Sequence, residues 1–310
     1  MSRRNESRLA PERPLTPRIE PLSDAVAPAS AAQRTVAVLE NEPIARDTFR
    51  LRLDDSRMAR AIRPGQFLMI RPAIGNDPLL GRPFALYQTA EHRDGAPGAV
   101  EVVYLVIGRG TRALARLRAG DEVTTWGPLG NGFGPPPTAG PVVFVAGGIG
   151  QTPFLALGQS WLGRVGYGEE GGAGAPKVES ATMLYGVRSK EYAAGLDDFA
   201  TSGIAVDLAT DDGSIGHRGF VTDLLRRRID RGDRPAHVVG CGPPAMLAAL
   251  AKIVADHGIP CDLSLENHMA CGFGVCFSCV APIHQPDGTT DLRRVCVEGP
   301  IFPARDVAWD

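Results

Sequence analysis

Between residues 35 and 126 the chain alternates apolar and polar residues over short stretches. In 35–39 and 48–53 an apolar residue recurs at every second position, which is the pattern of a strand with one face turned to a core. Glycine and proline separate these stretches, and 112–117 has helical character. The predicted strands are 35–39, 48–53, 66–71, 82–88, 100–107 and 122–126. Strands this short and numerous favour a small antiparallel β-barrel.

After residue 140 the pattern changes to continuous apolar stretches that alternate with amphipathic ones. Residues 142–146 are apolar throughout, as expected of a strand that is buried on both faces. The predicted strands are 142–146, 182–187, 204–209 and 237–240, and the predicted helices are 153–157, 191–200, 220–229 and 245–257. This order predicts a parallel sheet with a ligand crevice at the carboxyl ends of its strands. The fold class is therefore α/β plus all-β, with an antiparallel barrel before a parallel-sheet, nucleotide-binding domain.

Composition marks the segments outside these two units. Residues 1–33 are rich in Arg, Pro, Ser and Ala and predict a disordered tail, whereas the Gly- and Glu-rich residues 164–177 predict a mobile surface loop. Three consecutive prolines at 135–137 are typical of a linker. The predicted division is a tail at 1–33, a barrel at 34–138, an α/β domain at 139–260 and a cysteine-rich region at 261–310.

The charge balance restricts the partners. Lys and Arg total 33 against 35 Asp and Glu, giving a formal charge of −2, so no overall basic field favours nucleic acid or an anionic membrane. No apolar stretch has the length of a bilayer span, and the N-terminus lacks a hydrophobic signal core. We therefore expect a cytoplasmic protein with reduced cysteines and with small molecules or other proteins as partners.

Four of the six cysteines lie near the C-terminus, at Cys271, Cys276, Cys279 and Cys296. A C-x4-C-x2-C run followed by a distant cysteine is the plant-type spacing for a [2Fe-2S] cluster, in which thiolates ligate both irons. The glycines between the first two cysteines allow a tight loop whose amides point at the cluster. The spacing therefore predicts an iron-sulfur site.

Four cysteines have two other common uses in proteins, a zinc site and a disulfide framework. Structural zinc sites usually contain two C-x2-C pairs, and this chain has only one such pair, although His268 offers a further zinc ligand. A disulfide framework is typical of small secreted domains, and a chain of 310 residues buries enough surface without it. Zinc remains the alternative to the cluster.

Four further motifs are compatible with bound nucleotides, although each alone is equally compatible with an ordinary tight turn. An arginine beside an aromatic residue can hold a phosphate and flank a planar ring, and glycines before a helix expose backbone amides to an anion. The motifs are Arg82-Pro83-Phe84-Ala85, Gly108-Arg109-Gly110-Thr111, Gly147-Gly148-Ile149-Gly150-Gln151-Thr152-Pro153 and Cys241-Gly242-Pro243.

The order of these motifs resembles the ferredoxin-NADP reductase superfamily. With the cysteine loop and the segments 126–133 and 209–214, the chain from 35 to 302 resembles the electron-transfer subunits of type B dihydroorotate dehydrogenase. The resemblance implies FAD at Arg82 to Ala85, at Val103, Tyr104 and Leu105, and at Gly110 and Thr111. It also implies NAD over Gly147, Gly148, Gly150, Thr152 and Pro153 and near Cys241, Gly242 and Pro243. The family usually has Ser or Thr at position 85, so Ala85 leaves the flavin potential open.

The resemblance further implies a partner, an FMN-containing catalytic subunit that oxidises dihydroorotate to orotate in pyrimidine biosynthesis, with two copies of each chain. Electrons would pass from the partner's FMN through the cluster and FAD to NAD, with no general acid or base in this chain. The alternatives are a related NAD(P)H reductase subunit that serves ferredoxin or a sulfur substrate, and a zinc-stabilised, non-enzymatic interaction protein.

Two local features leave further choices open. Arg188, Ser189 and Lys190 follow a predicted strand and would favour NADP if they bound a 2'-phosphate. Apolar side chains surround the cysteine loop at Phe273, Val275 and Phe277. They either dock the partner subunit or shield the cluster from water.

Overall fold

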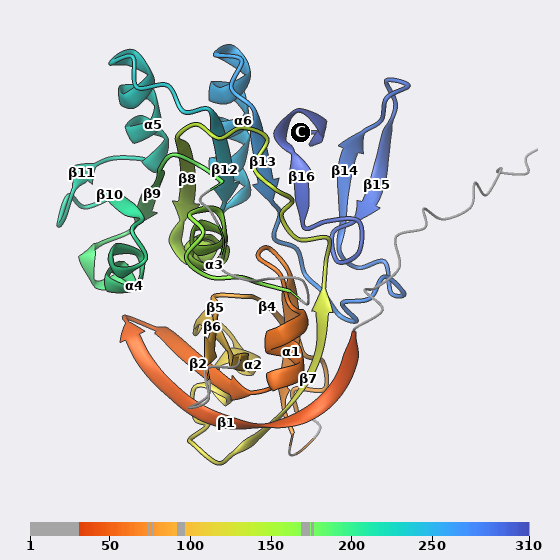
Figure 1. Cartoon of the computed structure of the whole chain (residues 1–310). Helices are drawn as coiled ribbons and strands as arrows, with labels where there is room; N and C mark the ends of the chain where they lie inside the picture. The colour runs from red at the N-terminus through yellow and green to blue at the C-terminus, as the bar shows by residue number, and fades with distance from the viewer. Residues whose placement is uncertain are drawn as a thin grey trace, which may run out of the picture.

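A curled antiparallel sheet lies below a parallel sheet in Figure 1, which shows a computed structural model of the chain, and a two-stranded lobe stands beside them. The structure describes residues 31–309 except 74, 76, 92–96, 169–173, 175 and 176. Most of the predicted tail, 1–30, and half of the predicted insertion therefore lie outside the described residues. Ala32 and Gln33, predicted as tail, already belong to the first strand, where they pair with Gly127 and Trp126.

The antiparallel sheet has seven strands. Its edge strands are consecutive in sequence, and Leu86 and Tyr87 between them donate backbone hydrogen bonds to Gln66 and Glu101, which closes the curve of the sheet. The predicted strand 82–88 is thus divided in two. The strand order is β4 (Arg82–Ala85), β3 (Phe67–Pro72), β7 (Glu122–Leu129), β1 (Ala32–Ala45), β2 (Thr48–Asp54), β6 (Pro97–Leu105) and β5 (Gln88–Glu91).

Two short helices accompany this sheet. The helix α1 (Ser56–Ala61) was not predicted; it begins after Asp55, whose carboxylate accepts the Met58 amide at 2.9 Å as an N-terminal cap. The predicted helix over 112–117 starts earlier, as α2 (Arg109–Leu114).

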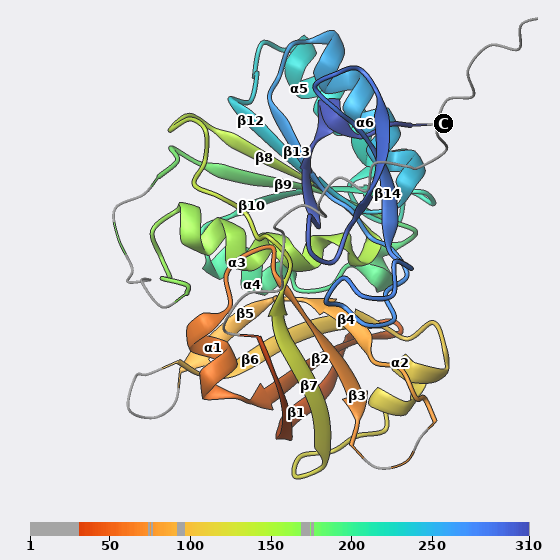
Figure 2. The same ribbon diagram turned by 90° about the vertical axis from the view of Figure 1, so that its right-hand side faces the viewer.

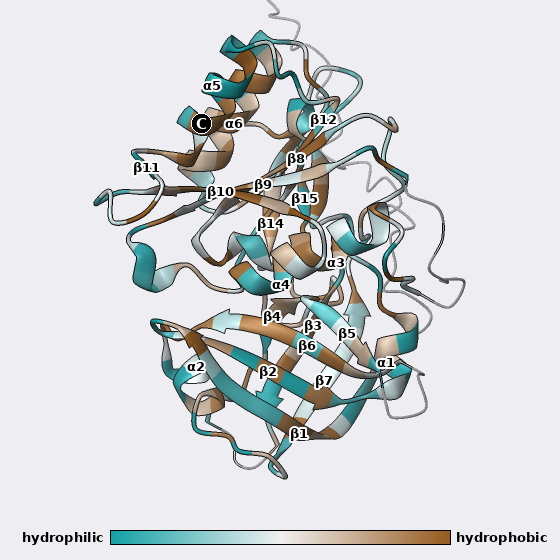
Figure 3. Cartoon of the chain, turned by 60° about the vertical axis from the view of Figure 1, so that its left-hand side comes forward, coloured by the Kyte–Doolittle hydropathy of each residue, from teal (hydrophilic) through white to brown (hydrophobic). Residues whose placement is uncertain are grey.

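The second sheet is parallel except at one edge. The strands at its centre are strongly apolar in Figure 3, because helices cover both faces of the sheet. The predicted strands are present, and three further strands extend the sheet: β11 at one edge, and β13 and β16, which use residues from the predicted cysteine-rich region. The order is β11 (His217–Arg218), β10 (Ala205–Thr210), β9 (Ala181–Val187), β8 (Val142–Gly147), β12 (His237–Cys241), β13 (Cys261–Ser264) and the antiparallel β16 (Ile301–Pro303).

The helices lie on opposite faces of the parallel sheet. In Figure 2 α3 (Thr152–Trp161) lies between this sheet and the barrel, whereas α5 (Val221–Asp230) and α6 (Pro244–Asp256) cover the far face. The predicted helix over 191–200 is interrupted, and only α4 (Leu196–Thr201) is regular. Gly195 has a left-handed φ of 72°, and a β-carbon there would collide with the Tyr87 hydroxyl, so the chain turns sharply before α4.

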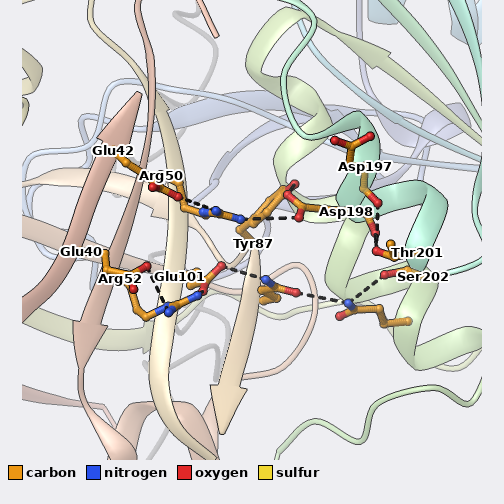
Figure 4. A network of polar contacts seen from close by, with 12 residues as sticks. Glu40, Glu42, Arg50, Arg52, Tyr87, Glu101, Asp197, Asp198, Thr201 and Ser202 are labelled. Carbon is orange, nitrogen blue, oxygen red and sulfur yellow. Dashed lines mark hydrogen bonds and ion pairs between the residues drawn. The ribbon is translucent and has the colours of Figure 1, made fainter. Parts of the chain in front are cut away.

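A polar network joins the barrel to α4 and α3 (Figure 4). The Tyr87 hydroxyl donates to Asp198 at 2.7 Å, and Arg50 pairs with the same carboxylate at 3.5 Å. Glu101, fully buried, accepts from Arg52 at 2.6 Å and from Gln88 at 2.8 Å. Because each buried charge has a partner of opposite sign or a hydrogen-bond donor, the network fixes the two sheets against each other without an unpaired ion.

The third unit is the lobe formed by β14 (Val280–His284) and β15 (Thr290–Arg294). Its core is continuous with both larger sheets, since Cys279, Cys296 and Val295 share one cluster with Met69 and Leu129 of the barrel.

The start of the predicted insertion is also packed: the Tyr167 hydroxyl donates to Gln159 at 2.5 Å. Within the described residues no helix has the length and apolar character needed to span a bilayer.

Candidate iron-sulfur and nucleotide sites

The four predicted ligands come together as two pairs of thiols. Cys271 lies close enough to Cys276 to affect its thiol, and Cys296 lies equally close to Cys279. The second pair is buried, whereas Cys276 is exposed and Cys271 half-buried. In the part of the chain that the structure describes, no three His, Cys, Asp or Glu side chains converge as ligands of a single metal ion. Four cysteine sulfurs in two pairs form a donor set that fits two irons, each with two thiolates.

Hydrogen bonds within this group already favour thiolates. The Ser278 hydroxyl, 3.2 Å from the Cys276 sulfur, lowers the pKa of that thiol to about 6. The bond with Cys296 lowers the pKa of Cys279 to about 6 and raises that of Cys296 itself. One member of the buried pair is therefore ready to bind a cation, and a bound iron would draw the proton from the other.

Left-handed glycines shape the loop between the first two cysteines. Gly272, with φ of 82°, packs on the barrel, and a β-carbon there would lie 2.8 Å from Met69 Cγ and 2.9 Å from Leu129 Cδ1. The carbonyl of Gly274 accepts from the buried Arg294 at 3.3 Å. No larger residue fits at Gly272, so the loop lies directly on β3 and β7.

A cavity of about 660 Å³ lies between the barrel and the parallel sheet. The predicted residues Leu105, Gly147, Gly148 and Pro243 line it, and so does Arg188, the possible ligand of a 2'-phosphate. Lining residues that were not predicted include Tyr185, Asp211, Phe220, Met246 and Glu266. The cavity is therefore bounded by a predicted FAD residue on one side and by predicted NAD residues on the other.

The two predicted FAD motifs meet on the barrel surface. A β-carbon at Gly110 would lie 3.2 Å from Arg82 Nε, so the arginine side chain crosses this glycine. Phe84 packs edge-on against Tyr104, with ring centroids 5.6 Å apart. The Thr111 hydroxyl accepts from the amides of residues 107 and 108, so it caps its own loop. Apart from Leu105, the predicted FAD residues do not line the cavity; they are Arg82, Pro83, Phe84, Ala85, Val103, Tyr104, Gly110 and Thr111.

The glycine turn after β8 packs on the Cys-Gly-Pro corner after β12. A β-carbon at Gly150 would collide with the Cys241 carbonyl, and one at Gly147 would lie 2.7 Å from Pro243 Cδ. Thr152 and Pro153 form the buried first turn of α3. The remaining predicted NAD residues therefore determine the conformation of the turn and do not line the cavity; they are Gly150, Thr152, Pro153, Cys241 and Gly242.

Glu266 is a site residue that the sequence did not reveal. Its carboxylate lines the cavity and lies 3.9 Å from the Cys241 sulfur, and burial raises its pKa. It follows β13, at the same carboxyl edge as the two predicted NAD motifs. Predicting β13 would have placed it there, because ligands bind at that edge of a parallel sheet.

Gln151, in the middle of the glycine turn, is fully buried, and neither atom of its amide has a hydrogen-bond partner among the described residues. We predict that Gln151→Met raises the free energy of unfolding by about 1–3 kcal/mol, because it removes an unpaired buried amide. Urea unfolding of the purified chain measures this change. Gln66→Met is the matched control: the Gln66 amide is equally buried but bonded to Arg63 and Gly130, so its loss should destabilise. Equal effects of both variants would contradict the explanation.

Comparison with known proteins agrees with this geometry. The model of the iron-sulfur cluster binding domain of dihydroorotate dehydrogenase B matches residues 266–308, which include all four cysteines. The electron transfer subunit of dihydroorotate dehydrogenase B (NAD(+)) from Desulforamulus reducens is 34% identical over 86% of this chain and 95% of its own length. The same subunit from Bacillus caldolyticus is 36% identical over 88% of this chain and 97% of its own length.

Solved structures agree on the fold. The structure of an NADH-dependent reduced ferredoxin-NADP oxidoreductase has a TM-score of 0.71 at 25% identity, covering 88% of this chain and 90% of that one. A ferredoxin NADP+ reductase from Neisseria gonorrhoeae, solved with bound FAD and NADP, has a TM-score of 0.56 at 15% identity, covering 73% and 92%. The predicted fold class, a barrel followed by a parallel nucleotide-binding sheet, is confirmed.

Proposed function

Since this chain belongs to the family of dihydroorotate dehydrogenase B electron transfer subunits, we propose that it carries electrons between a catalytic partner subunit and NAD(H). The observation that carries the proposal is the paired arrangement of four thiols on a reductase barrel beside a cavity between the sheets. The zinc-stabilised, non-enzymatic alternative is not favoured, and neither is a reductase that serves a different acceptor.

The residues present fit both groups that this role requires. Cys271, Cys276, Cys279 and Cys296 would hold the [2Fe-2S] cluster, and the Arg82 and Gly110 corner would hold FAD. When bound, flavin supplies the conversion between hydride transfer and single-electron transfer. The chain itself supplies position: it presents the cavity to the nicotinamide and the thiols to the partner. No described residue needs to donate or accept a substrate proton for this role.

We propose NAD in preference to NADP as the pyridine nucleotide. Asp211 and Arg188 both line the cavity. A carboxylate there can accept a hydrogen bond from a ribose 2'-hydroxyl and repels a 2'-phosphate, whereas an arginine alone would favour the phosphate. The partner is a catalytic subunit, and we propose that it contains FMN, oxidises dihydroorotate and assembles with this chain as two copies of each, in the cytoplasm.

The test is cofactor analysis of the anaerobically purified chain, followed by kinetics. We expect bound FAD, about two irons per chain, and reduction of the flavin by NADH at a far higher kcat/KM than by NADPH. Zinc without flavin in the purified chain would refute the proposal. A clear preference for NADPH would refute only the choice of nucleotide, and co-purification of an FMN-containing protein identifies the partner.

A further inference from the structure

Trp126 spans the distance between the cysteine loop and the strand that carries the flavin motif. Its indole N–H donates to the backbone carbonyl of Cys271 at 2.8 Å. At the other end of the ring, a β-carbon on Gly81 would collide with Cη2, so only glycine fits there. Gly81 directly precedes Arg82, the first residue of the flavin motif. One half-buried side chain therefore contacts a proposed cluster ligand and the start of the proposed flavin site.

The strand register explains this position. Met69 on β3 pairs with Trp126 on β7 and with Pro83 on β4, so these three residues form one row across the barrel. Gly272 packs on the same row, with its hypothetical β-carbon 2.8 Å from Met69 Cγ. The cluster loop and the flavin strand thus share three adjacent strands as their common support.

We propose that Trp126 is a positioning residue that sets the reduction potential of the cluster and the rate of electron transfer between cluster and flavin. The inference rests on the proposed function. The bond to Cys271 fixes the peptide between Cys271 and Gly272, and the potential of an iron-sulfur cluster depends on hydrogen bonds from its loop and on its exposure to solvent. The indole also fills the space between the two sites. Trp126 itself is neither oxidised nor reduced.

The test is Trp126→Phe in the full chain, purified anaerobically with its cofactors. The variant keeps an aromatic ring and loses the N–H donor. We expect unchanged iron and FAD contents and unchanged flavin reduction by NADH. The EPR spectrum and midpoint potential of the reduced cluster should shift, and the rate of cluster reduction in stopped flow should fall about tenfold, as for other residues that orient metal ligands.

The matched control is Trp161→Phe. Trp161 lies on α3 and also donates its indole N–H to a backbone carbonyl, that of Gly134 at 3.3 Å, but it contacts no cluster ligand. We expect its cluster potential and EPR spectrum to equal those of the wild type. A second variant, Gly81→Ala, displaces the Trp126 ring from the opposite side and should shift the same two properties. If Trp126→Phe does not fold, the Gly81→Ala variant tests the role of Trp126 instead.

Three results would overturn the inference. The first is a Trp126→Phe protein with wild-type EPR spectrum, potential and transfer rate. The second is loss of iron from this variant, which would show a merely structural role. The third is an equal shift in Trp161→Phe. Absence of iron or flavin from the wild-type chain refutes the proposed function together with this inference, and it is recognised before any variant is made.

Discussion

Cys279→Ala should remove the cluster while the flavin site stays intact. Cys279 is buried, and its free thiol neighbours that of Cys296, so alanine removes one of the two proposed ligands of one iron. We expect the variant to lose its iron. Electron transfer from NADH to a one-electron acceptor that is reduced through the cluster should fall more than about 100-fold. This loss exceeds the roughly 10- to 100-fold loss that is typical when only a residue supporting a metal ligand is changed. Flavin reduction by NADH should continue, since Arg82 and the cavity lie outside the cysteine loop.

Cys261→Ala is the matched control for this experiment. Cys261 is also a buried free thiol, lies on β13 of the neighbouring sheet and is not one of the four proposed ligands. The Cys261→Ala protein should keep its iron and should transfer electrons at the wild-type rate. Iron analysis, the visible spectrum and stopped-flow kinetics check both variants. If Cys279→Ala retains two irons per chain, the ligand assignment is wrong.

Val275→Asp should weaken the complex with the catalytic subunit and leave the cluster in place. Val275 lies beside Cys276 and is 72% exposed, with Phe273 and Phe277 about half exposed on either side. Because these side chains are at least about half exposed in the isolated chain, we expect a docked partner to cover them. A charge at the centre of such a contact should cost about 2–4 kcal/mol of binding, or roughly 30- to 1,000-fold in Kd.

Ile215→Asp is the control for the docking prediction. Ile215 is an exposed apolar residue between β10 and β11, at the opposite edge of the parallel sheet from β13 and β16. Its variant should bind the partner normally. Affinity is measured by titration of purified subunits, with iron content determined in parallel. Loss of iron from Val275→Asp would show that the side chain shields the cluster, and unchanged affinity would exclude it from the interface.

The periodicity predicted most of the strands because their apolar residues face a single core. It missed β11, β13 and β16 (Ile301–Pro303), since each is very short and gains its place only by pairing with another strand, and it also missed the pair of β14 and β15. The helix over 191–200 was overpredicted because its composition hides the effect of Gly195, which has a left-handed conformation and leaves no room for a β-carbon beside the Tyr87 hydroxyl. The family, in contrast, was predicted correctly from the order of the motifs.

The iron-sulfur site could be predicted because its ligands are recognised by their spacing along the sequence. The four cysteines follow a recognisable pattern, so their pairing needed only the fold to bring Cys296 to Cys279. Trp126 and Glu266 carry no such pattern. Trp126 reaches Cys271 across 145 residues of sequence, and Glu266 reaches the cavity only through the register of β13. The individual residues assigned to FAD and NAD stay predictions, to be tested by the cofactor analysis above.

The support of the cysteine loop on β3 and β7 sets an order for assembly of the protein. Residues 67–129 provide the surface on which Gly272 lies, and the ligands themselves come from residues 271–296, much later in the chain. Contacts over such separations form late in folding, because the intervening chain must first lose its freedom. We therefore expect the barrel to fold before iron is inserted, and chains shortened before Cys296 to retain a flavin site that can accept hydride and has no outlet for single electrons.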